Sequence, residues 1–201
     1  MLGLALIAAL ALGPRPAELV KPGEEANYAT WLEGQAKTAA GFYAHRDCAT
    51  ATVKPVSSGV TTDEQLSKRR PGALVYAERF AVAGCGEADA QGLVVIRETR
   101  WWLALPTAPG DSVASLSLQR EVLPTVIRAV KDAAEADTSC TALDKARSAL
   151  VYNTRVTKPA ALGQPWSERW FMGVCDTGYT VDIDFTPQGG RTTYQVRVAA
   201  R

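Results

Sequence analysis

The chain has 201 residues, of which 47% are hydrophobic and 21% are charged, as in an ordinary globular protein. This length suits one large domain or two small ones. The net charge of +1 excludes a broad electrostatic attraction to nucleic acid or to an anionic membrane, so nucleic acid is not an expected partner.

An uncharged apolar segment opens the sequence. Leu2 to Gly13 is a run of 12 residues without charge. It is too short to cross a membrane, since a span needs roughly 20 apolar residues, but it is typical of the core of a secretory signal. No Lys or Arg precedes it, and Ala9-x-Ala11 is the best match to a cleavage site. We interpret residues 1–21 as a signal-like leader or a short anchor, and we expect a periplasmic or secreted protein, with membrane association through residues 2–13 as the alternative.

The first half of the remaining chain indicates a helix followed by strands. Apolar residues recur at a spacing of three to four between residues 24 and 44, which predicts a helix. Thr62-Asp63-Glu64-Gln65 is typical of a short capped turn. Alternating or β-rich stretches predict strands on both sides of it, at 49–56, 76–84, 92–96 and 100–105.

The second half gives the same order of patterns. An amphipathic helix is expected to end near Ala136, with Pro124 in its first turn. Strands follow at 150–157 and 166–174, and then apolar and polar residues alternate over 179–186 and 192–198 around a Gly189-Gly190 turn. This predicts an antiparallel meander with one apolar and one polar face.

The cysteines support a duplication. Glu78-Arg79-Phe80 leads to Cys85 and Glu168-Arg169-Trp170 leads to Cys175, at an offset of 90 positions. Each block has an upstream cysteine: 37 positions separate Cys48 from Cys85, and 35 separate Cys140 from Cys175. Of the three connectivities that four cysteines allow, we expect the pairs Cys48–Cys85 and Cys140–Cys175, because equivalent units would carry equivalent bonds.

The second of these blocks also carries a resemblance. Trp166-x-Glu168-x-Trp170 leads to Cys175, then to an alternating strand and Gly189-Gly190-Arg191-Thr192. This is similar to a family of uncharacterised secreted bacterial proteins with a Glu-x-Trp-x-Val-x-x-Cys-Gly repeat. Here Gly follows the cysteine only in the first block, as Cys85-Gly86. The resemblance implies export, an unknown function and no catalytic residues.

Two kinds of residue are candidates for function. Glu78 and Glu168 are equivalent in the two blocks, so they could face each other as an acid/base pair. A structural hydrogen bond that each unit needs explains them equally. Strand alternation places Glu168 at a strand edge or in contact with a neighbouring strand. Trp101 and Trp102 point to opposite faces of a strand, and an exposed tryptophan is a candidate contact for a partner.

Other chemistry has little support in the sequence. Asp182 and Asp184 share one strand face and could hold a cation, but Arg191, Gln195 and Arg197 across the hairpin favour a charge-paired sheet face. His45 is the single histidine, and its place at a helix end favours a structural role. No phosphate loop, nucleophile elbow, Cys-x-x-Cys or metalloprotease motif is present, so neither a metal nor another cofactor is expected.

These observations predict an α+β protein: a tandem duplication of a helix plus antiparallel β-sheet unit, each unit closed by a disulfide. The units span residues 22–108 and 109–201 and join near Pro106 to Asp111. The leading hypothesis for function is a non-catalytic binding module of the bacterial envelope, with an envelope or membrane protein as partner. The alternatives are an exported hydrolase that uses Glu78 and Glu168, and an accessory subunit of a membrane-associated assembly. The ligand is not identified by any motif, and we expect no activity that depends on an activated side chain.

Overall fold

The structure is a computed structural model that describes residues 16, 18–44, 47–61, 63–86, 89–98, 100–134, 150–159, 161, 163–174 and 177–199. Three expectations from the sequence lie outside these residues: the apolar run at 2–13, the role of His45, and the pairing of Cys140 with Cys175.

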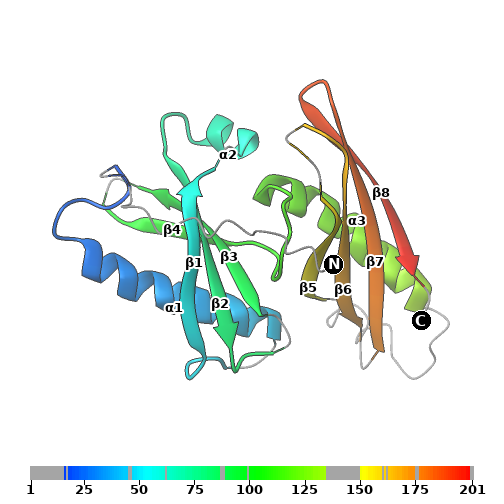
Figure 1. The fold of residues 1–201 in the computed structure, drawn as a ribbon, viewed down its shortest axis with the longest axis horizontal. Helices are drawn as coiled ribbons and strands as arrows, with labels where there is room; N and C mark the ends of the chain where they lie inside the picture. The colour runs from blue at the N-terminus through cyan, green and yellow to red at the C-terminus, as the bar shows by residue number, and fades with distance from the viewer. Residues whose placement is uncertain are drawn as a thin grey trace, which may run out of the picture.

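The first half of the chain forms a helix and a four-stranded sheet (Figure 1). Its elements are α1 (Glu25–Ala44), β1 (Thr52–Val60), α2 (Glu64–Arg69), β2 (Val75–Ala83), β3 (Ala90–Arg97) and β4 (Trp102–Pro106). The strands pair in chain order, each antiparallel to the next, so the sheet is a meander. The short α2 is capped by the Asp63 carboxylate, which accepts from the Leu66 amide at 3.0 Å, as the Thr62–Gln65 pattern predicted.

The second half repeats the order of helix and four strands. Its elements are α3 (Leu116–Ala134), β5 (Leu150–Lys158), β6 (Trp166–Val174), β7 (Thr177–Gln188) and β8 (Arg191–Ala199). Their order in the sheet is again β5-β6-β7-β8 with every neighbour antiparallel. The observed strands agree with the expected ones to within a few residues, because the period-2 pattern identifies a strand better than it identifies its ends. The α+β class is therefore confirmed.

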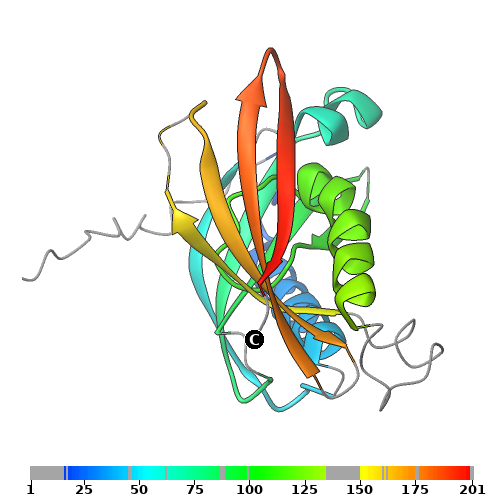
Figure 2. The same cartoon turned by 90° about the vertical axis from the view of Figure 1, so that its right-hand side faces the viewer.

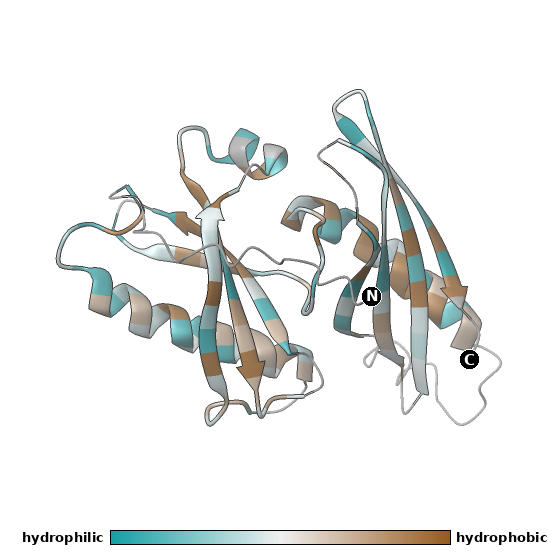
Figure 3. Cartoon of the chain, in the orientation of Figure 1, coloured by the Kyte–Doolittle hydropathy of each residue, from teal (hydrophilic) through white to brown (hydrophobic). Residues whose placement is uncertain are grey.

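One face of each sheet packs against the helix of its own half. In the first unit, α1 and the sheet bury an apolar cluster that includes Tyr28, Leu32 and Phe80. In the second, α3 packs along β8 and over β6 and β7, as Figure 2 shows, and the cluster includes Val126, Trp170 and Ile183. The alternation of apolar and polar residues along β7 and β8 is visible in Figure 3. It follows from the strand period, which sends successive side chains to opposite faces.

A third, smaller cluster lies on the other face of the first sheet. It brings Leu66 of α2 and Leu116 at the start of α3 onto Val75, Val94 and Ile96. This face of the first sheet is therefore partly covered by the second half of the chain. The two halves also share a partly buried polar contact: Asp63 accepts from the Ser117 amide at 2.9 Å and from the Ser117 hydroxyl at 2.6 Å.

The disulfide Cys48–Cys85 is present, with its Cα atoms 5.5 Å apart. This confirms the expected pairing in the first unit. Leu19 and Val20, which the sequence interpretation assigned to the leader, are buried in the first cluster. The indole of Trp102 also donates to the Leu19 carbonyl at 2.8 Å. The folded part of the first unit thus includes residues before 22. Among the described helices, none has the length and hydropathy of a membrane span.

Candidate functional site

The segment between β4 and α3 runs along the first sheet before it reaches the second unit. The Thr107 amide donates to the Gly92 carbonyl at 3.0 Å, and the Gly110 amide donates to the Ala90 carbonyl at 2.9 Å. Gly110 has φ +95°, and a Cβ there would lie 2.2 Å from the Thr154 carbonyl oxygen. Only glycine fits this close approach. We call residues 107–115 the junction.

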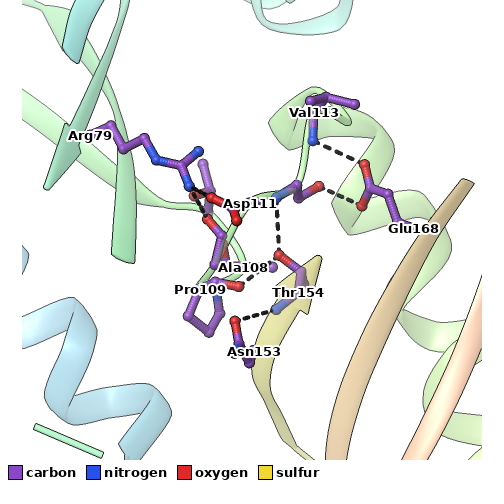
Figure 4. A network of polar contacts seen from close by, with 11 residues as sticks. Arg79, Ala108, Pro109, Asp111, Val113, Asn153, Thr154 and Glu168 are labelled. Carbon is purple, nitrogen blue, oxygen red and sulfur yellow. Dashed lines mark hydrogen bonds and ion pairs between the residues drawn. The ribbon is translucent and has the colours of Figure 1, made fainter. Parts of the chain in front are cut away.

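Thr154 of β5 binds the junction from the second sheet (Figure 4). Its hydroxyl donates to the Pro109 carbonyl at 2.7 Å and accepts from the Ser112 amide at 3.0 Å. Its carbonyl accepts from the Asp111 amide at 2.8 Å. Thr154 is completely buried. Three backbone groups of the junction, on Pro109, Asp111 and Ser112, therefore have their partners on one residue of the second unit.

Arg79 of β2 binds the junction from the first sheet. Its guanidinium donates to the Gly110 carbonyl at 2.9 Å and forms an ion pair with the Asp111 carboxylate (Figure 4). The junction is thus bonded on one side to the first sheet and on the other to the second, which joins the two units across a short connection.

Glu168 of β6 is completely buried and accepts five hydrogen bonds. Oε1 accepts from the Val113 amide at 3.0 Å, the Ala114 amide at 3.1 Å and the Trp166 indole at 3.1 Å. Oε2 accepts from the Ser112 hydroxyl at 2.8 Å and the Trp170 indole at 2.9 Å. The carboxylate therefore satisfies donors of the segment that leads into α3, a role typical of a structural anion near a helix start.

This arrangement corrects the expectation for Glu168. The sequence analysis placed it at a strand edge or against a neighbouring strand, but its partners are the junction and two tryptophans of its own strand. Strand alternation correctly put Trp166, Glu168 and Trp170 on one face; it carried no information on the loop 54 to 56 positions earlier that covers this face.

Glu78 of β2 is buried to a similar degree, with 1% of its surface exposed. One of its carboxylate oxygens accepts from the Tyr28 hydroxyl of α1 at 3.0 Å. The two glutamates thus lie in different sheets. Glu78 accepts from Tyr28 of α1, whereas Glu168 accepts from the junction and from tryptophans of its own strand. An acid/base pair would instead need both carboxylates to converge on one groove.

The two adjacent tryptophans have different surroundings. Trp102 packs on the first cluster, with its ring 5.0 Å from that of Tyr28 and the Arg97 guanidinium 4.9 Å above it. Trp101 is 54% exposed. β4 begins at Trp102, so the expectation that both rings project from one strand was wrong for Trp101, which immediately precedes the strand. Of the two, Trp101 is the more accessible to a partner.

The outer face of the second sheet carries paired charges. Arg169 donates two hydrogen bonds to Asp182, at 2.7 and 3.0 Å, which raises the pKa of Arg169. The Ser167 hydroxyl, at 2.6 Å, and then Arg197 lower the pKa of Asp184 by donating to it. The sequence analysis expected the Asp182 side chain to pair with β8. Its carboxylate instead forms an ion pair with Arg169 of β6. Within the described part of the chain, no group of three His, Cys, Asp or Glu side chains is placed to hold a metal ion.

A groove of about 480 Å³ lies between the outer face of the first sheet and the junction. Its floor has small side chains because Gly59, Ala77 and Gly92 lie there on three adjacent strands. Val60 and Val113 line it and are each 64% exposed. Glu78 is buried and Arg79 is paired with Asp111, so the lining presents no unpaired charge.

Sequence reasoning missed the residues that build this site. Pro109-Gly110 is a turn signal and falls within the expected connection, but the close approach of Thr154 has no local pattern. Arg79 was part of the repeated Glu-Arg block, and its partner Asp111 lies 32 positions away. No family model, curated protein or solved structure matches the chain.

Proposed function

We propose that this chain is an exported, non-catalytic binding module of the bacterial envelope. In this proposal the groove between the first sheet and the junction binds an extended, uncharged segment of an envelope or membrane protein. The observation that carries it is the groove itself: it is neutral, mixes hydroxyl, glycine and apolar residues, and has exposed valines on its lining. Such a lining suits a polypeptide backbone with small side chains better than a strongly charged ligand.

Export is part of the proposal. It is supported by the disulfide Cys48–Cys85, since disulfides persist in oxidising compartments such as the periplasm, and by the signal-like run at residues 2–13. The resemblance to secreted bacterial proteins with a Glu-x-Trp repeat points the same way.

We also propose that the two units arose by tandem duplication. Both have the order helix, then a four-stranded meander. On the second strand of each, a buried glutamate is followed two positions later by a buried aromatic residue: Glu78 and Phe80 in the first, Glu168 and Trp170 in the second. Each glutamate accepts from its helix or from the segment that leads into it.

The groove is the feature that favours a binding module over the hydrolase alternative. A hydrolase based on paired carboxylates needs both groups to converge on one accessible cleft. Glu168 is already saturated with five donors, and both glutamates are buried beneath different helices. A folded Glu168→Gln variant that lost a measurable turnover would favour the hydrolase.

The test is site-specific photocrosslinking in cells that make the full chain. A benzophenone amino acid at Val60 or Val113 lies in the groove, whereas the same residue at Val56, which is 47% exposed, lies outside its lining. We expect Val60 and Val113 to capture one shared envelope protein and Val56 not to capture it.

A second step tests binding with pure components. The captured segment, made as a peptide, should bind the protein and lose that binding in Ala77→Phe, which fills the groove floor. Ala81→Phe is the matched control, because Ala81 lies on the same face of β2 but outside the groove. Equal capture at all three valines, or equal binding by the two phenylalanine variants, would contradict the proposal.

A further inference from the structure

A second pocket adjoins the groove and lies between the end of α1, the side of α3 and the second sheet. It has a volume of about 360 Å³. Trp170 and Val151 of the second sheet lie in its lining, 0% and 2% exposed, and Phe42 of α1 is 63% exposed beside them. A volume near the lower end of the range for small-molecule sites, with an aromatic and aliphatic lining, is suited to a small apolar ligand.

The helix α3 has more apolar surface than its own sheet covers. Val122, Val126 and Val130 face the second sheet and are fully buried. Leu123 and Ile127, one position further along the helix, are only partly buried and line the pocket. The spacing of four residues places them in a row along the helix, so the pocket offers an elongated apolar wall.

One cationic side chain, Arg120, lies at this pocket. Arg120 lines it and is exposed, and it is the single charged residue of the lining. Its guanidinium has no hydrogen bond or ion pair among the residues that the structure describes. Tyr43 also lines the pocket: burial raises its pKa, and the charge of Arg120 acts in the opposite direction. Tyr43 and Arg120 thus line the same pocket.

We propose that this pocket binds an anionic amphiphile of the fatty-acid class. The acyl chain lies against Leu123, Ile127 and Phe42, and the carboxylate pairs with Arg120. Charge complementarity selects an anion, and the volume selects a single chain. A protein helix would need a far larger contact, since stable protein interfaces bury about 800 Å² on each partner.

The site adjoins the groove of the proposed function but is carried by different residues. Its lining includes Leu116 and Gln119, which also line that groove, but none of the residues that carry this proposal lies in the groove. Failure of the peptide experiment would therefore leave this inference standing, and the reverse also holds.

The experiment is a calorimetric titration of the full chain with octanoate, decanoate and dodecanoate below their micelle concentrations. Two added methylenes should tighten the dissociation constant roughly tenfold while the chain still fits, since each buried methylene contributes about 0.8 kcal/mol. We expect saturable 1:1 binding, and a chain length beyond which affinity stops rising because the pocket is filled.

Variants test the two ends of the ligand separately. Arg120→Gln should weaken binding of the carboxylate about fivefold, whereas Arg128→Gln, an exposed cation of the same helix outside the pocket, should leave it unchanged. Leu123→Trp should abolish binding by filling the pocket. An alkyl trimethylammonium of equal chain length should bind the wild-type protein more weakly than the carboxylate.

Three outcomes would overturn the proposal. The first is the absence of saturable binding by any of the acids. The second is equal affinity in Arg120→Gln and Arg128→Gln, which would show that the carboxylate of the ligand does not pair with Arg120. The third is undiminished binding by a Leu123→Trp variant whose circular dichroism matches that of the wild type, which would place the acyl chain elsewhere.

Discussion

Replacement of Glu168 by Gln removes one oxygen from a carboxylate that serves five donors. The amide oxygen can take the place of Oε1, where it faces the Val113 and Ala114 amides and the Trp166 indole. Its NH2 group then takes the place of Oε2 and points at the Trp170 indole N–H, which is 2.9 Å from that oxygen in the wild type. The Ser112 hydroxyl can turn and accept, but an indole N–H cannot.

The size of the effect follows from these contacts. A buried donor left without an acceptor costs about 1–3 kcal/mol. The three bonds to the remaining oxygen change from a charged to a neutral acceptor, which roughly halves the strength of each. We therefore expect Glu168→Gln to lower the free energy of unfolding by about 3 kcal/mol.

Urea unfolding followed by far-ultraviolet circular dichroism measures this loss, because fluorescence would also report the altered contacts of Trp166 and Trp170. Glu121→Gln is the matched control, since Glu121 is exposed on α3, and we expect it to stay within about 0.5 kcal/mol of the wild type. Hydrogen exchange should in addition accelerate at the Val113 and Ala114 amides in Glu168→Gln.

The reasoning would be refuted if Glu168→Gln unfolded within about 0.5 kcal/mol of the wild type with an unchanged denaturant slope. Unchanged exchange at the Val113 and Ala114 amides would refute it independently, because these amides are bonded to the carboxylate in the native state.

Three further changes probe other contacts. Gly110→Ala should lower the free energy of unfolding by about 3 kcal/mol or more, because the new Cβ meets backbone atoms of β5. Gly72→Ala, with a positive φ but open space, should lose only about 1 kcal/mol; equal losses in urea unfolding would contradict the steric argument. Replacing both Cys48 and Cys85 by Ala opens a loop closed over 37 positions. By the chain-entropy model of disulfide stabilisation, this should lower the free energy of unfolding by about 4 kcal/mol in the same assay, and a loss below about 1 kcal/mol would count against that model. The pKa of Asp184 is lowered in the folded state, chiefly by the Ser167 hydroxyl and then by Arg197, so its carboxylate stabilises the fold above the unfolded pKa of about 4 and loses this contribution as the pH falls through the folded pKa. Asp184→Asn should therefore melt below the wild type at pH 7 and approach it at acid pH, and a melting difference that is constant with pH would contradict this.

The local architecture could be predicted from the sequence because it depends on periodicity. Alternation over 179–186 and 192–198 predicted β7 and β8, and spacing of three to four residues predicted the existence of α1 and α3. The start of α3 was placed too late, because Pro124 was expected in its first turn and lies inside the helix. The face shared by Trp166, Glu168 and Trp170 follows from the same period of two. The pairing of Cys48 with Cys85 came from comparing the two blocks, and the structure confirms it.

The contacts of the candidate sites were decided by tertiary structure. Glu168 and the Val113 amide are 55 positions apart, and Thr154 and Pro109 are 45 apart. No pattern within one element reports which distant loop will cover its buried face. The expectation that Glu168 contacts a neighbouring strand was wrong for this reason.

The same limit applies to the two cavities. The groove exists because the junction passes over small residues on three strands, and the apolar pocket exists because the end of α1 packs near β5 and leaves a space beside α3. The sequence by itself determined the helices, the strands and the face on which each side chain lies, since these follow from backbone geometry within a few residues. Which of those faces meet, and what space remains between them, was decided only when the two units packed together, because that packing depends on the shape and burial of residues far apart in the chain.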